Sequence, residues 1–385
     1  MNYHSSSGLY VHVPFCLSKC PYCDFYSVTD LSILNAWLEA LEKEAGLYRD
    51  TFGEFDTLYL GGGTPSLLEP ADLEALLAGL RRHFHFHSHT EVTLEANPDD
   101  LSREKLAAYR ELGINRLSVG VQSFNDKDLA FLGRRHTAKQ AAQVLDWARA
   151  AGFANLSLDL MYALPGKTEK DWRETLERAL ACHPEHLSCY QLTVEAGTPL
   201  GARKARGEFQ AAEEDLEEAL FLLTSQFLED HGYLHYEISN FARGEENCCR
   251  HNPKYWQHVP YLGLGPGAHS FSSGNGAQGS PFIKNRVRWW NHADLERYLK
   301  ALATGAAPVA GRETLTPEQL RLETLYLGFR TRRGVALEDV QGFGNWEAAL
   351  AELAQAGLVE VSQGRARPTC RGFLMADGLP LRFGD

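Results

Sequence analysis

The sequence lacks any apolar run long enough to span a membrane, which takes roughly 18 uninterrupted apolar residues. Residues 1–8 have neither the basic start nor the apolar stretch of a signal peptide, so we expect no secretory leader. A disordered or collagen-like composition is also absent, because 44% of the 385 residues are hydrophobic. These absences predict a folded cytoplasmic protein with a large core.

Long basic runs are missing as well. The chain has 38 Lys and Arg residues against 50 Asp and Glu residues, a formal net charge of −12. Nucleic-acid phosphates and anionic membrane surfaces repel such a chain, so we expect no nucleic-acid partner, and any membrane-associated partner must bind through specific contacts. In a reducing cytosol the eight cysteines are ligands, catalysts or core residues rather than disulfide partners.

Short apolar runs alternate with longer amphipathic stretches over the first half of the chain. This alternation predicts an α/β fold with a parallel sheet and crossover helices, and its spacing favours a barrel or partial barrel. The carboxyl ends of such strands build active sites, and polar residues stand there. The predicted strands are 9–13, 57–60, 92–95, 117–121, 156–160 and 186–192, and the predicted helices are 31–48, 71–82, 103–112, 139–151 and 169–182.

The alternation of predicted strands and helices ends near residue 240. Residues 241–282 are rich in Gly, Asn, His and aromatics, which indicates an irregular extension. Two helical patterns and a short hairpin follow from Pro317, an order that resembles a winged helix. On so acidic a chain, a structural or docking role is favoured over DNA binding. We predict a barrel over 1–240, an extension over 241–310 and a winged-helix-like C-terminal domain over 311–385.

A cluster of cysteines follows the first predicted strand. Cys16, Cys20 and Cys23 have the spacing C-x3-C-x2-C, and a loop of this size can place three thiolates on three corners of one [4Fe–4S] cubane. The fourth iron then lacks a protein ligand and can be chelated by S-adenosylmethionine (SAM). Zinc with His12 as a fourth ligand is one alternative, although the spacing is not that of common zinc sites, and plain core cysteines are another.

A glycine triplet, Gly61–Gly63, follows the second predicted strand. Without side chains, its backbone can approach a ligand closely and present N–H and C=O groups. Alone, such a triplet predicts a turn. One strand after the cysteine loop, it predicts a binding loop for the SAM amino group. Tyr22, beside the third cysteine, either packs as an ordinary aromatic or contacts the adenine.

Five ordered motifs carry a resemblance to a known family. Their order and spacing over residues 8–372 resemble the radical SAM family of oxygen-independent coproporphyrinogen III oxidases and their relatives. The resemblance implies a partial (β/α)6 barrel with the cluster at its mouth. The motifs are the cysteine loop, Gly61-Gly-Gly-Thr-Pro-Ser66, Leu94-Glu-Ala-Asn-Pro98, Asn115-Arg-Leu-Ser-Val-Gly-Val-Gln-Ser-Phe124 and Asp159-Leu-Met-Tyr-Ala-Leu-Pro165.

The resemblance also implies SAM contacts around the barrel mouth, with one or two SAM molecules bound. Glu95 and Asp159 can accept from ribose hydroxyls or an ammonium, and Arg134 can pair with a carboxylate. Each side chain can instead make an ordinary barrel hydrogen bond or ion pair. The implied contacts are Tyr10, Tyr22, Gly62, Gly63, Thr64, Glu95, Gln122, Arg134, Asp159 and Thr193.

Two features separate the branches of this family. The cysteine loop of the oxidases looks like C-x3-C-x2-C-x-C and follows a longer leading segment. This chain has Phe25 at the position of the last cysteine and only fifteen residues before Cys16. The segment His251-Asn-Pro-Lys-Tyr-Trp256 matches an H-N-x-x-Y-W motif typical of the heme (haem) chaperone branch, whose members bind heme and pass it to an acceptor. Both features favour the chaperone branch.

A heme site is predicted around His251. Imidazole is a natural axial ligand for heme iron, and the faces of Tyr255 and Trp256 can pack on a porphyrin. A thiolate from Cys248 or Cys249 is a second ligand option. The alternative is that this segment only anchors the extension onto the barrel.

Other residues of interest carry weaker signals. Arg286 and Arg288, close to a pair of tryptophans, can meet heme propionates. The alternating histidines of residues 83–89 suggest a metal site. They stand between a predicted helix and a predicted strand, however, where an exposed segment without a metal is favoured. Three isolated cysteines are predicted to be small buried hydrophobes: Cys182, Cys189 and Cys370.

Two classes of function compete. We favour a heme-binding and heme-delivery protein whose partners are heme and an unidentified acceptor protein, at a membrane or in the cytoplasm. The alternative is an enzyme supplied by an electron donor, either a coproporphyrinogen III oxidase that converts propionates to vinyl groups or a radical enzyme with another substrate. No side chain is predicted to be catalytic beyond cluster and SAM binding.

Overall fold

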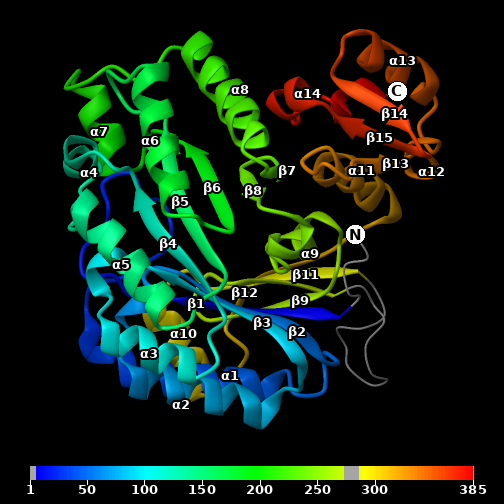
Figure 1. Cartoon of the computed structure of the whole chain (residues 1–385). Coiled ribbons are helices and arrows are strands. Elements are labelled where there is room, and N and C mark those ends of the chain that lie inside the picture. Colours follow the sequence, from blue (N-terminus) through cyan, green and yellow to red (C-terminus); the bar gives the residue numbers. More distant parts are fainter. Residues whose placement is uncertain (1–5, 273–285, 385) are drawn as a thin grey trace.

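The computed structural model describes residues 6–272 and 286–384, and a parallel sheet forms its centre (Figure 1). Its strands are buried, and the inward side chains of the first strand, Leu9, Val11 and Val13, are fully removed from solvent. Strands buried on both faces read as near-continuous apolar runs, which is why the sequence identified them. They are β1 (Ser7–Val13), β2 (Phe55–Gly62), β3 (Phe86–Ala96), β4 (Arg116–Gln122), β5 (Leu156–Tyr162) and β6 (His186–Gln191).

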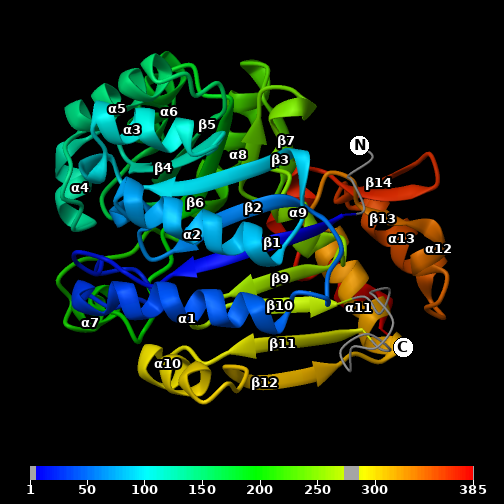
Figure 2. The same cartoon turned by 90° about the horizontal axis from the view of Figure 1, so that it is seen from below.

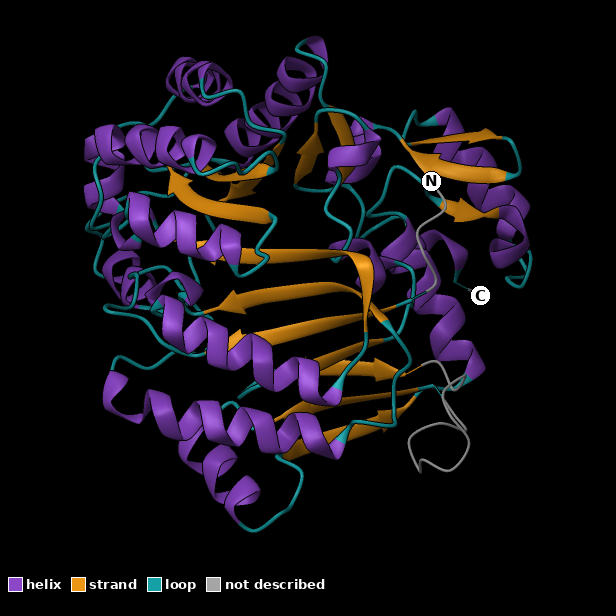
Figure 3. Ribbon diagram, turned by 60° about the horizontal axis from the view of Figure 1, so that its bottom comes forward, coloured by secondary structure: helices purple, strands orange, loops and turns teal. Residues whose placement is uncertain are grey.

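Helices cover the outer face of this sheet (Figures 2 and 3). In α5 (Ala138–Ala150) the buried residues Ala141, Val144, Leu145 and Ala148 recur at helical spacing, and a capping box at Thr137 begins the helix. The other helices of this layer are α1 (Leu34–Leu47), α2 (Pro70–His83), α3 (Arg103–Glu111), α4 (Asp126–Phe131) and α6 (Glu169–Ala181). The predicted partial (β/α)6 barrel is confirmed.

Antiparallel strands lengthen the sheet on both sides. Beyond β6 lie β8 (Asn240–Ala242) and β7 (Leu234–Glu237), after the helices α7 (Pro199–Ala205) and α8 (Glu214–Asp230). Beyond β1 lie β9 (Tyr261–Leu264), parallel to β1, and then β10 (His269–Ser272), β11 (Val287–Asn291) and β12 (Val309–Thr314), each antiparallel to its neighbour. Figure 2 shows these strands side by side.

The region predicted to be an irregular extension therefore contains short strands. They are only four to six residues long, and glycines interrupt them, so no alternation long enough to predict a strand develops. A buried carboxylate joins this extension to the barrel. Glu44 of α1 accepts hydrogen bonds from Gly265 N (2.8 Å), Asn291 Nδ2 (2.6 Å) and the Tyr298 hydroxyl (2.6 Å), the last from α10 (Leu295–Ala303). Burial raises the pKa of Glu44 to about 7.

The C-terminal residues form a separate small domain. Its core is its own and includes Leu325, Phe329, Val340 and Phe383. Backbone hydrogen bonds join it to the barrel edge, from Ile238 N to Arg330 O (3.1 Å) among others. Its elements are α11 (Pro317–Gly328), β13 (Val335–Ala336), α12 (Leu337–Val340), α13 (Trp346–Gln355), β14 (Val359–Ser362), β15 (Arg365–Pro368) and α14 (Cys370–Leu374). No helix among the described residues is long and apolar enough to cross a membrane.

Candidate functional site

A cavity of about 490 Å³ opens at the carboxyl ends of the six parallel strands. We call it the cluster cavity because the three cysteines of the loop after β1 line it: Cys16, Cys20 and Cys23. Nine of the predicted SAM contacts also line it, which are Tyr22, Gly62, Gly63, Thr64, Glu95, Gln122, Arg134, Asp159 and Thr193. The parallel strands thus bring residues from seven separate segments, six of them at or directly after a strand, to one place, as a barrel mouth requires.

The cysteine loop is closed at its base and receives donors at its sulfurs. Cys16 N donates to Val28 O at 2.9 Å, so the loop leaves β1 and returns beside it. The Thr64 hydroxyl lies 3.3 Å from Cys16 Sγ, and Arg134 Nη1 lies 3.5 Å from Cys20 Sγ. Hydrogen-bond donors and a positive charge beside cysteine sulfurs are typical of the surroundings of an iron–sulfur cluster, so the residues present fit one.

The cysteine sulfurs are not arranged around one point. Among the described residues, no three His, Cys, Asp or Glu side chains form a group that could hold a single metal ion. A cubane does not need such a group, because each thiolate binds a different iron atom. The donor set of three cysteines and a neighbouring open cavity fits the predicted [4Fe–4S] cluster with its fourth iron facing the cavity.

The glycine triplet lies directly against the cysteine loop. Gly62 has a φ of +106°, a conformation that glycine adopts readily. A Cβ at Gly63 would lie 2.7 Å from Phe15 O and 2.8 Å from Val13 O, both backbone atoms. Only glycine therefore allows the end of β2 to approach the cluster loop this closely, and the triplet leaves its backbone facing the cavity.

Two half-buried carboxylates, Glu95 and Asp159, line the inner wall of the cluster cavity. Glu95 accepts from the Tyr59 hydroxyl at 2.8 Å and from Gly62 N at 3.2 Å, and Asp159 accepts from the Ser118 hydroxyl at 3.1 Å. Burial, followed by the charge of Asp159, raises the pKa of Glu95 to about 7, and burial raises that of Asp159 to about 6. Such carboxylates favour a ligand that brings a cation and hydroxyl donors, as the sulfonium and ribose of SAM do.

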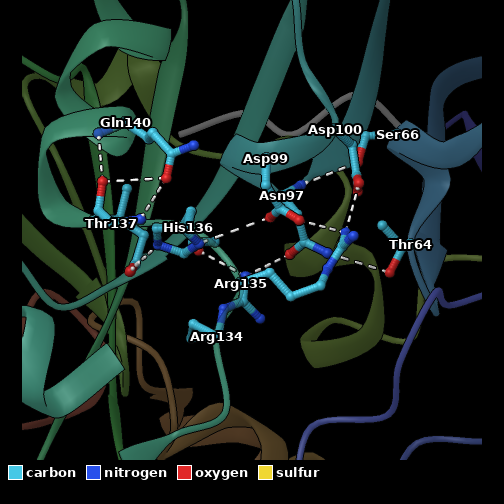
Figure 4. A network of polar contacts seen from close by, with 12 residues as sticks. Thr64, Ser66, Asn97, Asp99, Asp100, Arg134, Arg135, His136, Thr137 and Gln140 are labelled. Carbon is cyan, nitrogen blue, oxygen red and sulfur yellow. Dashed lines mark hydrogen bonds and ion pairs between the residues drawn. The ribbon is translucent and has the colours of Figure 1, made fainter. Parts of the chain in front are cut away.

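A polar network holds Arg134 at the cavity (Figure 4). Its guanidinium donates to the Asn97 side chain and to Gly120 O at 2.9 Å. Asn97 in turn donates to the Thr64 hydroxyl at 3.3 Å, so one network reaches both side chains that donate to cysteine sulfur. Arg135, its neighbour, points to Asp99 and Asp100 instead.

Several residues that line the cluster cavity were not predicted to contact SAM. Gln122, which was predicted as a SAM contact, lines the cavity with a φ of +64°, a strained value that non-glycine residues seldom adopt. Two of the missed residues stand at alternate positions on β4 before Gln122, so the period of two along a strand was the signal that could have found them. The missed residues include Asn97, Ser118, Gly120, Met161, Tyr190 and Gln191.

Tyr10 is the one predicted SAM contact that does not line the cluster cavity. Its hydroxyl lies 3.2 Å from His12 Nδ1, and both residues line a second cavity of about 680 Å³. We call this one the aromatic cavity, because Tyr255, Tyr261 and Phe271 also line it. The SAM contact of Tyr10 stays a prediction.

His251 lies inside the barrel rather than at an open surface. Its side chain is 1% exposed, with Nδ1 2.8 Å from the Thr57 hydroxyl and Nε2 2.8 Å from the Tyr255 hydroxyl. Burial, followed by the charge of Lys254, lowers its pKa to about 3, so the ring is neutral. Iron could bind it only in place of one of these two hydrogen bonds, and its heme role stays a prediction.

The two predicted thiolate ligands near His251 are also buried. Cys248 and Cys249 are 3% and 1% exposed, and burial raises their pKa values to about 12 and about 11. They are therefore thiols at neutral pH. Cys189 is likewise buried, while Cys182 and Cys370 are partly exposed.

The two arginines predicted to meet propionates are separated. Arg288 lines the aromatic cavity, but its guanidinium is bound by Glu313 at 2.9 Å and Glu323 at 3.0 Å. Arg286 and Arg321 line a different hollow. His251 lines neither this hollow nor the aromatic cavity. Of the histidine run, residues 85, 87 and 89 are exposed at the start of β3.

Comparison with known proteins identifies the family. The radical SAM superfamily model matches residues 10–179, and the HemN C-terminal domain model matches residues 315–375. The heme chaperone HemW of Mycobacterium tuberculosis is 38% identical over 97% of this chain and 93% of its own length, and that of Bacillus subtilis is 34% identical over 96% of each. The solved structure of coproporphyrinogen III oxidase (HemN) from Escherichia coli has a TM-score of 0.79 at 23% identity, covering 99% of this chain and 91% of that chain.

The match to the HemN structure shows the fold alone. The two HemW relatives match both the barrel and the C-terminal domain at more than 30% identity. The cluster cavity has the cysteines, glycines and carboxylates that a radical SAM site needs. Family membership implies a [4Fe–4S] cluster and SAM. The chain therefore belongs to the radical SAM superfamily and, within it, to the family of the heme chaperone HemW.

Proposed function

We propose that this protein is a heme chaperone, which binds heme as cargo and transfers it to an acceptor protein. The observation that carries the proposal is the match to curated heme chaperones over nearly the whole chain, barrel and C-terminal domain together. The side chain at position 25 supports it. Phe25 stands where the resembling oxidases have a further cysteine, and its ring is 69% exposed between the cluster cavity and the aromatic cavity.

The cluster cavity would hold the cofactors of this chaperone. Cys16, Cys20 and Cys23 would bind the cluster, whose chemistry when reduced is the one-electron cleavage of SAM. Glu95 and Asp159 would accept hydrogen bonds from SAM and balance its sulfonium charge. Arg134, held by Asn97, would keep a positive charge beside the cluster sulfurs. Whether one or two SAM molecules bind is part of the prediction and is measured by the stoichiometry of SAM binding.

The partners follow from this function. The acceptor would be a protein that requires heme, and the net charge of −12 makes specific contacts, rather than attraction to an anionic membrane, the basis of recognition. An electron donor is needed only if SAM is cleaved during transfer. A cytoplasmic location is part of the same proposal.

The test is a heme titration followed by a transfer assay. The cluster is reconstituted without oxygen, heme is added, and the Soret band is followed until it saturates. A chaperone is expected to bind close to one heme per chain and to lose it to an apo-protein that requires heme. Turnover of coproporphyrinogen to protoporphyrinogen by the same sample would instead show an oxidase and overturn the proposal.

A further inference from the structure

The aromatic cavity lies next to the cluster cavity. Asp24 and Phe25 of the cysteine loop line both cavities. The floor of the aromatic cavity is one face of the antiparallel strands β9, β10 and β11. In their register Phe271 lies opposite both Tyr261 and Arg288, and His269 lies opposite Trp290. This register places aromatic and imidazole rings on one face.

Aromatic rings pack against one another along one wall of the aromatic cavity. The rings of Tyr255 and Tyr261 meet edge to face, 4.6 Å apart between centroids at 87°, and those of Tyr261 and Phe271 are 6.2 Å apart and tilted by 30°. The volume of about 680 Å³ is within the range of about 300–1,000 Å³ that holds small molecules and cofactors. Aromatic walls of this kind suit a planar, largely apolar ligand.

The C-terminal domain closes one side of this cavity. Glu323 of α11 lies 3.3 Å from His258 Nε2 and 3.0 Å from Arg288 Nη2, so it connects the loop after α9 (Asn252–Trp256), strand β11 and the C-terminal domain. Leu327 of the same helix also lines the cavity. A ligand bound here would touch the barrel extension and the C-terminal domain together.

His269 differs from the other imidazoles near the cavity. His12 contacts the Tyr10 hydroxyl and Tyr26 O, His251 contacts two hydroxyls, and His258 contacts Glu323. The His269 side chain is exposed, and no side chain or backbone group in the described residues hydrogen-bonds its ring. The ring lies nearly parallel to Trp290, 5.9 Å between centroids at 23°, which orients it without occupying either nitrogen.

The protonation state of His269 also suits a metal ligand. Desolvation, followed by the charge of Arg288, lowers the pKa of His269, so the ring is neutral near pH 7 and keeps a nitrogen lone pair.

From these contacts we infer that the aromatic cavity is the heme cargo site and that His269 is an axial ligand of the heme iron. The inference rests on the proposed function and adds to it the place and the ligand of the cargo. Neutral imidazole is a common protein ligand of heme iron, and the neighbouring rings supply the flat contacts that a porphyrin needs. The site also places the cargo directly beside the cluster loop, with Phe25 between them.

The inference is tested with heme titrations of the full-length protein. In His269→Ala, loss of the axial bond is expected to weaken heme binding about tenfold or more and to shift the Soret maximum. Added imidazole should restore the Soret position, because the cavity that holds the porphyrin remains. Ala293→Trp, at an exposed loop residue of the cavity lining, should block binding without touching the core. His89→Ala is the matched control at an exposed histidine and should bind as the wild type does.

The outcomes separate the two proposals. If the wild type binds no heme, the proposed function and this inference both fail. If the wild type binds heme but His269→Ala and Ala293→Trp bind it with unchanged affinity and spectrum, the function stands and the inferred site is wrong. In that case the loss of binding in His251→Ala would return the ligand to the buried histidine of the H-N-x-x-Y-W segment.

Discussion

The two neighbouring cavities of this protein are built in different ways. The cluster cavity collects residues from the ends of six parallel strands, and its ligands stand in short motifs along the chain. The aromatic cavity collects residues from β1, the cysteine loop, antiparallel strands, the short helix α9 and the C-terminal domain, and these residues are spread along the chain, with Tyr255 of the H-N-x-x-Y-W segment among them. The first cavity offers thiols, glycines and carboxylates, and the second offers aromatic rings and imidazoles.

This difference separates a cofactor site from a cargo site. A resident cofactor needs ligands with defined geometry on rigid elements, which the barrel strands provide. A cargo must enter and leave, and the aromatic cavity is bounded partly by a second domain, which meets the extension through ion pairs, hydrogen bonds and an apolar cluster that includes Phe271 and Leu320. The following experiments test whether the two sites act independently, from the largest expected effect to the smallest.

Removing one cluster cysteine should have the largest effect. In Cys20→Ala we expect the iron content after reconstitution to fall from about four atoms per chain to near zero, because a cubane held by three thiolates cannot lose one of them. Heme affinity should stay within about threefold of the wild type if the cavities are independent. Iron analysis and a heme titration measure both. Cys182→Ala, at a partly exposed cysteine outside the cavity, is the control.

Neutralising Glu95 should weaken SAM binding selectively. Hydrogen bonds to a charged group contribute about 1.5–3 kcal/mol, so Glu95→Gln is expected to raise the Kd for SAM at pH 8 by about tenfold to a hundredfold. Equilibrium dialysis with labelled SAM on the reconstituted protein measures this. Glu347→Gln, at an exposed glutamate of the C-terminal domain, should change nothing. Equal affinity in Glu95→Gln and the wild type would remove Glu95 from the SAM site.

SAM affinity should also depend on pH. The pKa of Glu95 is raised to about 7, so its carboxyl takes up a proton as the pH falls through 7 and loses the charge that attracts a sulfonium. Between pH 8 and pH 6 the Kd is therefore expected to rise about tenfold, with a further rise as Asp159 protonates near pH 6. In Glu95→Gln the first part of this dependence should disappear. A flat profile for the wild type would contradict the assignment.

Replacing Phe25, which lies between the two cavities, should have the smallest effect on ligand affinity. Its ring is 69% exposed, so Phe25→Ser removes little buried surface, and we expect affinities for SAM and heme to weaken by no more than about two- to fivefold each. The cluster should form normally. A much larger loss for one ligand alone would show that Phe25 belongs to that ligand's cavity rather than to the boundary between them.

Much of the cluster site could be predicted from the sequence. The apolar runs revealed the six strands, and the motifs after them contained the three cysteines and seven of the nine predicted contacts that line the cavity, while Arg134 and Thr193 stand outside the motifs. Ser118 and Gly120 were not predicted to contact SAM although they alternate with Gln122 along β4, and Tyr10, whose SAM contact stays a prediction, lines the other cavity. Along a strand, the sequence predicts which residues share a face but not which of the two faces meets the site.

The rest needed the tertiary structure. The sequence by itself determined the barrel and the cluster loop, because near-continuous apolar strands and closely spaced thiols are local patterns. It pointed to His251 for heme, yet the fold surrounds that ring with two hydroxyls, while His269 remains open on a four-residue strand too short to predict. Only the pairing of β9, β10 and β11 and the docking of α11 decide which rings face one another, because those contacts join residues far apart in the chain.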